Sequence, residues 1–340
     1  MPKTIRHCYF EHLTFENLLN AHNRCCRSKK KSYERLRFEL DLETNIANLL
    51  QKLKDGTYNC GKYREFILYE SKKRVIKSLP YVDRVVHQWY IEEFIKPYIV
   101  PRFIHDTYAC IEDRGTHKAV DTVQRYMRIM KRNCGEYYIM KMDISKYFYS
   151  IDKDILYGIM QKIIKDKYLL WLTRIFIYDN DDKKGIPIGN YTSQYYANIY
   201  LNELDHFVKD KLKCRFYVRY MDDFILLVKD KETARKNFKV IQDFLHEHLQ
   251  LELNNKSRYF PNYKGLDFCG FKIYETHKLL RRKCKVRIRR KVKKWNKMYL
   301  ENKLDLHQTL LCYNSYLAHS SHCSSYNFNK KLEDSMLFKL

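Results

Sequence analysis

CxxC cysteine pairs, long apolar runs and an apolar leader are all missing from this sequence of 340 residues. Its 11 cysteines form no CxxC pair, and structural zinc sites take about four ligands in paired spacings. Cysteine and histidine gather in two places, the adjacent pair Cys25 and Cys26 and the group His319, His322 and Cys323. We therefore expect no zinc centre and expect reduced thiols, as in a cytosolic protein.

Apolar segments long enough for a membrane are also absent. No run of 18 apolar residues occurs, so the sequence predicts no helix that spans a bilayer. The first residues, MPKTIRHCYFEH, lack the apolar centre of a signal peptide. We expect a cytoplasmic protein with no membrane partner.

Acidic residues are scarce relative to basic ones. Lysine and arginine total 65 against 40 aspartates and glutamates, a formal net charge of +25. A charge of this size indicates a polyanionic partner, most commonly nucleic acid. Residues 278–297 contain 12 cations and no acid, whereas a merely solvated helix usually mixes the two signs. We expect this segment to contact a nucleic-acid backbone.

Two aspartates interrupt an apolar stretch, FYVRYMDDFILLV, at residues 216–228. The runs on either side are rich in β-branched and aromatic residues, so they read as two strands of a hairpin with Asp222 and Asp223 at its tip. A solvated turn would explain a bare pair of aspartates. Strands on both sides favour a cation that neutralises the two carboxylates, and oxygen ligands suit Mg²⁺.

A third carboxylate follows the apolar segment 137–142, which also reads as a strand and ends at Asp143. Three neighbouring carboxylates would suit phosphoryl transfer with two metal ions. One ion activates a 3′-hydroxyl, and the other holds the triphosphate and the leaving pyrophosphate.

The remaining pattern predicts the other elements of a mixed helix and sheet protein. Residues 1–62 read as a helical extension interrupted by a basic loop at 24–31, and 66–69 with 74–78 read as a hairpin. Thr192 or Ser193 is a candidate N-cap of a long helix. Short β-elements are expected at 251–253 and 266–274. Apolar residues after the basic run, among them Trp295 and Leu310, suggest a small helical bundle.

Read in order, these motifs resemble those of a reverse transcriptase over roughly residues 63–300. The resemblance implies an α+β right-hand fold, with fingers and palm interleaved in 63–275 and a basic helical thumb in 276–340. It implies RNA-directed DNA polymerase activity, with two Mg²⁺ ions held by Asp143, Asp222, Asp223 and the carbonyl of Ile144. Deoxynucleotides, template RNA and an RNA/cDNA hybrid would be its substrates and partners.

The same resemblance assigns residues to the nucleotide and to nucleic acid. Phe148, five residues after Asp143, matches an aromatic steric gate against the 2′-hydroxyl. The remaining nucleotide contacts would be Lys72 and Arg74 on the fingers turn, Ile188, Gly189, Gln194 and, at the pyrophosphate, Lys256. The thumb contacts would be Arg282, Lys285, Arg287, Arg289, Arg290, Lys293 and Lys294.

One motif departs from the common family pattern. Most members read PQGxxxSP before the long helix, whereas here Pro187 is followed by Ile188, Gly189 and then Ser193-Gln194. This form resembles the reverse transcriptases of diversity-generating retroelements, encoded by bacteria or phages. The resemblance implies cDNA with errors at template adenines, mutagenic retrohoming and a small, basic, oligomeric accessory variability protein. Two alternatives stay open: a phage-defence or other domesticated enzyme with its own non-coding RNA, and an RNA-binding scaffold with little activity.

Overall fold

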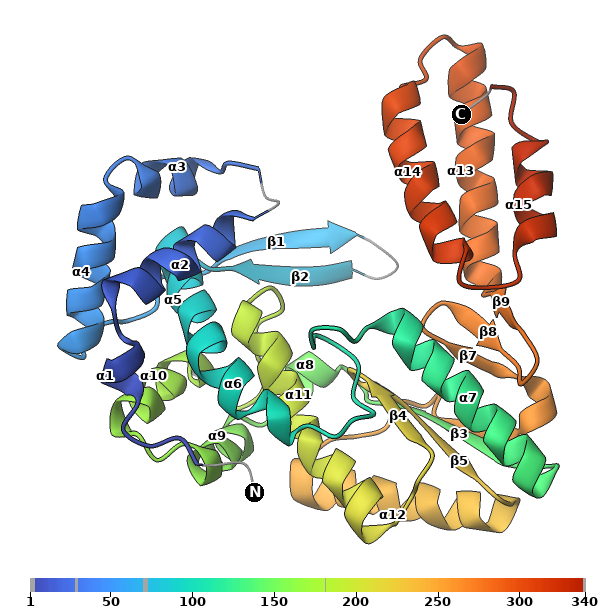
Figure 1. Cartoon of the computed structure of the whole chain (residues 1–340), viewed down its shortest axis with the longest axis horizontal. Helices are drawn as coiled ribbons and strands as arrows, with labels where there is room; N and C mark the ends of the chain where they lie inside the picture. The colour runs from blue at the N-terminus through green and yellow to red at the C-terminus, as the bar shows by residue number, and fades with distance from the viewer. Residues whose placement is uncertain (1–3, 28–29, 70–72, 181, 339–340) are drawn as a thin grey trace. The chain divides into compact units, whose positions relative to one another are not determined.

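The computed structural model describes residues 4–27, 30–69, 73–180 and 182–338. Helices and antiparallel sheets are both present, which confirms the α+β class (Figure 1). The chain divides into two compact units. The first comprises Met1–Ile111, Asp143–Arg215 and Lys239–Lys256, and the second comprises Glu112–Met142, Phe216–Phe238 and Ser257–Leu340.

The first unit is mainly helical. Its helices are α1 (Tyr9–His12), α2 (Phe15–Cys26), α3 (Tyr33–Glu39), α4 (Leu42–Lys54), α5 (Tyr81–Tyr90), α6 (Lys96–Tyr98), α8 (Tyr147–Ser150), α9 (Lys153–Ile163), α10 (Lys167–Ile177) and α11 (Tyr191–His206). Single π-helical turns, Ile91–Ile95 and Phe207–Lys211, continue α5 and α11, and a 3₁₀ turn lies at Val100–Arg102. Helix α11 is buried around most of its surface, so it forms the centre of this unit.

Local sequence signals explain where several of these helices begin and end. The side chains of Thr14, Asp152 and Asp166 accept hydrogen bonds from the first backbone N–H groups of α2, α9 and α10. Gly56 follows α4 with a φ of 68°, as expected for a helix end. Residues 24–26, predicted as the start of the basic loop, are helical, because α2 continues to Cys26.

The predicted N-cap of α11 is wrong. Asn190 takes the cap position, and Thr192 and Ser193 lie inside the helix. The Thr192 hydroxyl is 2.9 Å from Nδ1 of His87, so a contact within the unit holds this side chain.

A two-stranded hairpin completes the first unit. β1 (Arg64–Tyr69) pairs antiparallel with β2 (Lys73–Ser78), close to the predicted bounds. Every residue of β1 is exposed, although REFILY is largely apolar.

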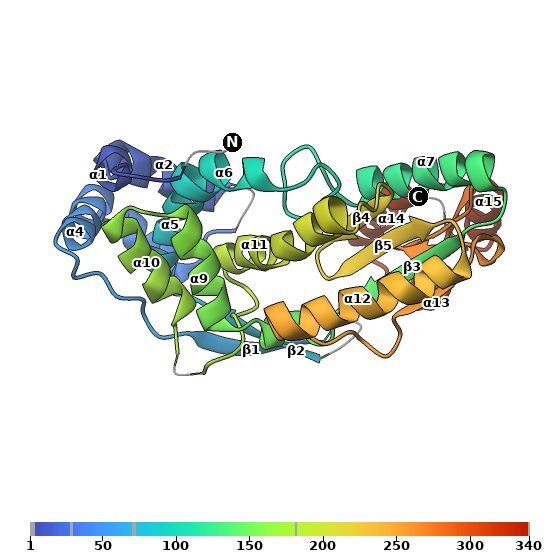
Figure 2. The same ribbon diagram turned by 90° about the horizontal axis from the view of Figure 1, so that it is seen from below.

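The second unit contains the main sheet, whose strand order is β4-β5-β3-β6. Its strands are β3 (Tyr138–Asp143), β4 (Tyr217–Tyr220), β5 (Asp223–Val228) and β6 (Arg258–Pro261). Helix α7 (Thr116–Cys134) lies on one face, where the ring of Tyr126 meets that of Phe216. The start of α12 (Lys231–Leu249) lies on the other face (Figure 2), with the Phe238 ring against Tyr259 of β6.

A second, smaller sheet joins three short strands. β7 (Leu266–Phe268), β8 (Phe271–Ile273) and β9 (Lys278–Leu280) pair in that order. The single β-element predicted at 266–274 is thus two strands, and the first residues of the basic run form a third. The strand predicted at 251–253 is wrong, because Leu253 makes only an isolated bridge to Ile144.

Three helices end the chain: α13 (Arg282–Leu300), α14 (Leu306–Ser320) and α15 (Tyr326–Glu333). They enclose a core of Ile288, Val292, Trp295, Tyr313, Leu332 and Phe338, which confirms the predicted bundle. Leu310, expected in that core, is exposed. Within the described ranges, no helix combines the length and apolar character needed to cross a bilayer.

Candidate active site

The β4–β5 hairpin carries the predicted pair of aspartates on a buried support. Tyr220 pairs with Asp223, so Met221 and Asp222 form the turn, and Met221 takes a φ of 55°. The apolar residues of β5 are buried, whereas both aspartates are half-buried. Burial of the strands fixes the direction in which the turn presents its carboxylates.

Arg219 supports this turn from inside. Its side chain is 0% exposed, and its Nη1 donates a hydrogen bond of 3.1 Å to the Met221 carbonyl. A buried guanidinium that bonds the turn limits its movement. The sequence pattern gave no reason to single out this arginine, which reads as one residue of an alternating strand.

The third aspartate lies at the end of a neighbouring strand. β3 ends at Asp143, β5 begins at Asp223, and the two strands are adjacent in the sheet. Lys141 on β3 sends its ammonium to within 3.3 Å of Asp223 Oδ2, and it donates a 2.6 Å hydrogen bond to the Asp267 carbonyl. One cation thus already offsets part of the carboxylate charge. Burial and the charge of Asp223 together raise the pKa of the Cys269 thiol.

The backbone after β3 is held by the segment that follows α12. Asn254 N donates to the Asp143 carbonyl at 2.7 Å, and Ser145 N donates to the Glu252 carbonyl at 2.9 Å. These two bonds flank the bridge between Ile144 and Leu253, so this bridge is a non-hydrogen-bonded antiparallel pair. The Ile144 carbonyl therefore points away from Leu253, which is compatible with its predicted role as a metal ligand.

Lys256 follows in the same turn. Its side chain is exposed, and its backbone N–H donates to Asn254 Oδ1 at 3.1 Å. Asn254 therefore connects the backbone of Lys256 to that of Asp143. Sequence reasoning missed Asn254, although it lies two residues before the predicted lysine.

The motif before α11 forms a turn against strand β2. The Ile188 carbonyl accepts a hydrogen bond of 2.9 Å from Lys77 N. Gly189 has a φ of 129°, and a Cβ there would lie 2.6 Å from the Lys77 carbonyl oxygen, so only glycine fits. Asn190, buried and not predicted, donates from Nδ2 to the Tyr63 hydroxyl at 2.7 Å.

Arg74 lies on the same strand as Lys77 and is exposed. It lies three positions before Lys77, whose backbone N–H bonds the Ile188 carbonyl, a distance of roughly 10 Å at the rise of a strand. Lys72 lies outside the described residues. The structure thus brings Ile188 and Gly189 to the base of the hairpin, and Arg74 nearer its tip.

Phe148 belongs to the short helix α8 and is half-buried. Its carbonyl accepts a 2.8 Å hydrogen bond from Ile186 N, two residues before Ile188. The predicted gate and the predicted nucleotide turn therefore lie on directly bonded segments of the first unit.

A polar cavity of about 430 Å³ opens beside this turn, and its lining includes Gly189, Asn190 and Gln194. Gln194 is exposed on α11. His87 also lines the cavity, and complete burial lowers its pKa to about 3, so the ring is neutral at physiological pH.

The predicted thumb cations fall on two faces of α13. Its third face, with Ile288, Val292 and Trp295, packs into the bundle core. Four predicted cations, Arg282, Arg287, Arg290 and Lys294, line an open groove of about 760 Å³. The other three are directed toward α15, where Lys285 and Arg289 lie 5.5 and 5.0 Å from the Phe328 ring and Lys293 lines a second cavity.

The sequence of this chain is similar to those of known proteins. A family described as "Reverse transcriptase (RNA-dependent DNA polymerase)" matches residues 60–273. The chain belongs to the reverse transcriptase family. The matched region includes all three aspartates and every nucleotide contact predicted above, while α1 to α4 and α13 to α15 lie outside it.

Two curated relatives are similar to this reverse transcriptase chain. The group II intron-encoded protein LtrA of Lactococcus lactis subsp. cremoris is 28% identical over an alignment of 187 residues, and the match covers 51% of this chain and 30% of that protein. Protein YkfC of Escherichia coli (strain K12) is 23% identical over an alignment of 291 residues, and the match covers 71% of this chain and 74% of that protein. The chain thus spans less than a third of LtrA.

Solved telomerase structures are similar in fold to parts of the chain. Apo telomerase from Candida tropicalis has a TM-score of 0.48 and 14% identity, covering 70% of this chain and 60% of that one. Telomerase from Candida albicans with a telomeric RNA fragment has a TM-score of 0.47 and 11% identity, covering 74% of this chain and 55% of that one.

Proposed function

We propose that the chain is an RNA-directed DNA polymerase that adds deoxynucleotides by phosphoryl transfer at Asp143, Asp222 and Asp223. The observation that carries this proposal is the sheet order. The strand that ends at Asp143 is the neighbour of the strand that begins at Asp223, within a region that matches the reverse transcriptase family.

The donor set fits two Mg²⁺ ions. Carboxylates and a backbone carbonyl are hard oxygen ligands, which Mg²⁺ prefers. When bound, the ions would activate the 3′-hydroxyl and neutralise the triphosphate and the leaving pyrophosphate. Asp143, Asp222, Asp223 and the Ile144 carbonyl would hold them. Arg219 acts as a positioning residue, because it holds the turn on which Asp222 lies.

Residues of the first unit would bind the incoming nucleotide. Arg74 and Lys72 would engage the triphosphate, for which a guanidinium fork and an ammonium are both suited. Phe148 would occupy the space of a 2′-hydroxyl. The turn at Ile188 and Gly189 would lie against the nucleotide, with Gln194, Lys256 and the pyrophosphate nearby.

Template RNA and the RNA/cDNA hybrid would bind along α13. A groove lined by four of the predicted arginines and lysines can follow a phosphate backbone without reading sequence. The cations directed at Phe328 are less suited to this role, since their charges already face a ring within the bundle.

The finer proposal is mutagenic retrohoming, in which the cDNA carries errors at template adenines and replaces part of a target gene. It rests on Ile188, which presents an apolar side chain where most of the family has glutamine. Without a polar contact there, discrimination against a misplaced base should weaken by about 1–3 kcal/mol at most. A small, basic, oligomeric accessory protein would assist.

Primer extension on a defined RNA template, followed by deep sequencing of the cDNA, tests both levels. Mg²⁺-dependent extension that needs an RNA template supports the polymerase. An error excess at template adenines supports the retrohoming role. Extension with a uniform error spectrum would leave the polymerase in place and overturn the adenine-directed role, whereas no extension at all would favour a scaffold.

A further inference from the structure

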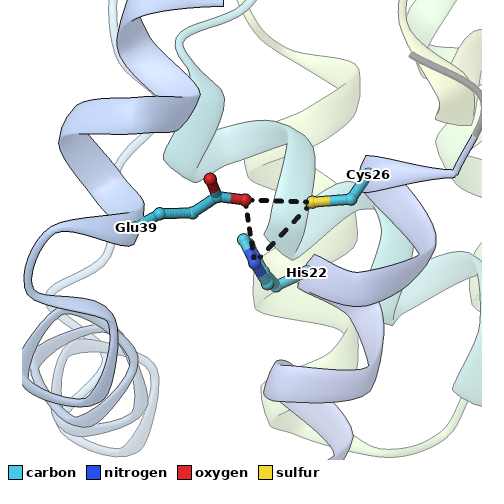
Figure 3. A group of neighbouring side chains, drawn as sticks. All are labelled: His22, Cys26 and Glu39. Carbon is cyan, nitrogen blue, oxygen red and sulfur yellow. Dashed lines mark hydrogen bonds and ion pairs between the residues drawn. The ribbon is translucent and has the colours of Figure 1, made fainter. Parts of the chain in front are cut away.

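A second cluster of metal-ligating side chains lies in the first unit, outside the region that matches the reverse transcriptase family. His22 and Cys26 are one helical turn apart on α2, and Glu39 is the last residue of α3. Figure 3 shows the three side chains converging from the two helices. The imidazole is buried, and the thiol and the carboxylate are half-buried.

The three donor atoms form a nearly equilateral triangle. His22 Nε2 lies 3.7 Å from Cys26 Sγ and 3.7 Å from Glu39 Oε1, and Cys26 Sγ lies 3.6 Å from the same oxygen. Ligands at ordinary zinc bond lengths in a tetrahedral site are about 3.3–3.6 Å apart. The triangle thus has almost the size of one face of a zinc tetrahedron.

The surroundings prepare the imidazole as a ligand. Nδ1 of His22 lies 3.0 Å from the Tyr81 hydroxyl, an outer contact that orients the ring and leaves Nε2 directed at the triangle.

Arg35 is the one described cation that bonds the cluster directly, and its Nε donates to Glu39 Oε1 at 2.7 Å. A carboxylate oxygen has two lone pairs, so this bond can persist as an outer hydrogen bond while the same oxygen binds a metal. A thiolate and a carboxylate together would balance the two charges of a divalent ion.

We propose that His22, Cys26 and Glu39 bind a Zn²⁺ ion, with water as the fourth ligand. A nitrogen, sulfur and oxygen set suits zinc and not Mg²⁺, which prefers oxygen alone. The ion would tie α2, which ends at Cys26, to α3, which begins at Tyr33. The sequence did not reveal the site, because its acidic ligand comes from a different helix and none of the spacings is CxxC.

The test is a Co²⁺ titration of the full chain after treatment with a chelator, read by absorption. Tetrahedral Co²⁺ bound to a thiolate gives a charge-transfer band and intense visible bands, which report the ligands independently of polymerase activity. We expect the charge-transfer band to saturate at one Co²⁺ per chain and to be displaced by one equivalent of Zn²⁺, whereas Co²⁺ bound by the three aspartates contributes no thiolate band. Zinc should also raise the melting temperature of the metal-free protein.

Variants identify the ligands. Cys26→Ala should abolish the charge-transfer band and weaken Co²⁺ binding by more than about 100-fold, the upper effect of an outer contact. Tyr81→Phe should weaken binding by about tenfold while keeping the band. The matched control is Cys25→Ala, because the Cys25 thiol faces the Arg84 carbonyl instead and its loss should leave the band intact.

The wild-type chain alone can overturn the proposal, whatever the variants do to folding. If the soluble wild-type chain gives no thiolate band with Co²⁺ and purifies without stoichiometric zinc, the three side chains form only a hydrogen-bonded network and the proposal is wrong. Equal loss of the band in Cys25→Ala and Cys26→Ala would also count against these ligands.

Discussion

Two antiparallel hairpins, β1–β2 and β4–β5, are both rich in apolar and aromatic residues, but their surroundings are opposite. On β5, Phe224, Ile225 and Leu226 are at most 1% exposed. On β1, Ile67 is 46% exposed and Tyr69 is 75% exposed. Helices cover both faces of the sheet that contains β4 and β5, whereas no residue of β1 is covered within the described structure.

The difference separates two tasks. A hairpin fixed in a core can hold charged groups in one geometry, which metal-dependent chemistry requires. An exposed hairpin keeps apolar and basic side chains available for a substrate, as an exposed apolar patch usually indicates. We therefore propose that β4–β5 carries the chemistry and that β2, with the turn at Ile188 beside it, contacts the nucleotide.

The largest expected effect is on the chemistry of the buried hairpin. Asp222→Asn should lower the rate of single-nucleotide extension by at least about a thousandfold, because it removes a metal ligand whose ion contributes several kcal/mol. RNA affinity, measured by filter binding, should change less than about twofold. Asp230→Asn is the control, since it removes one carboxylate charge beyond the far end of β5 while asparagine can still cap α12. An extension rate equal to that of the wild type in Asp222→Asn would show that this hairpin does not take part in catalysis.

The next largest effect concerns folding. Ile225→Ala, in the buried hairpin, should reduce the free energy of unfolding by about 2–5 kcal/mol, whereas Ile67→Ala, in the exposed hairpin, should change it by less than about 1 kcal/mol. Denaturant titration of both variants measures the difference. Similar losses would mean that β1 is part of a core after all.

A matched pair of triple variants extends the comparison to α13. Arg287, Arg290 and Lys294 line the groove, while Lys285, Arg289 and Lys293 face α15. Changing the groove set to glutamine should lower the salt dependence of RNA affinity by about 2–3 units of slope. Changing Lys285, Arg289 and Lys293 to glutamine removes the same amount of charge and should alter the slope of RNA affinity against salt less. Equal changes would indicate that only net charge matters.

The smallest effect is on fidelity. Ile188→Gln should reduce misincorporation opposite template adenine by about two- to tenfold relative to other bases, because it adds a polar group at the nucleotide turn. Ile188→Val keeps the apolar character and serves as the control. Error frequencies come from sequencing cDNA made at identical nucleotide concentrations. An adenine excess that is the same in all three enzymes would remove Ile188 from the explanation.

Much of this architecture follows from local sequence, and the rest does not. The hairpin around Asp222 is readable because two apolar strands bound a short polar turn. The hydrogen bonds from Arg219 to Met221 and from Asn254 to Asp143 cannot be predicted from the sequence. The first depends on the register of the hairpin, and the second joins segments far apart in the chain. The N-cap of α11 was misplaced because Asn190, Thr192 and Ser193 are all good capping residues.

Metal-directed backbone cleavage tests the central claim most directly. Fe²⁺ in place of Mg²⁺, with ascorbate and peroxide, produces radicals that cut the chain next to the bound ion. If these carboxylates share a metal site, the wild-type chain should be cut near Asp143 and near Asp222. Excess Mg²⁺ should suppress both cuts, and both should be lost together in Asp222→Asn. Cuts at only one of the two positions, or cuts that persist in Asp222→Asn, would contradict a shared metal site on these carboxylates.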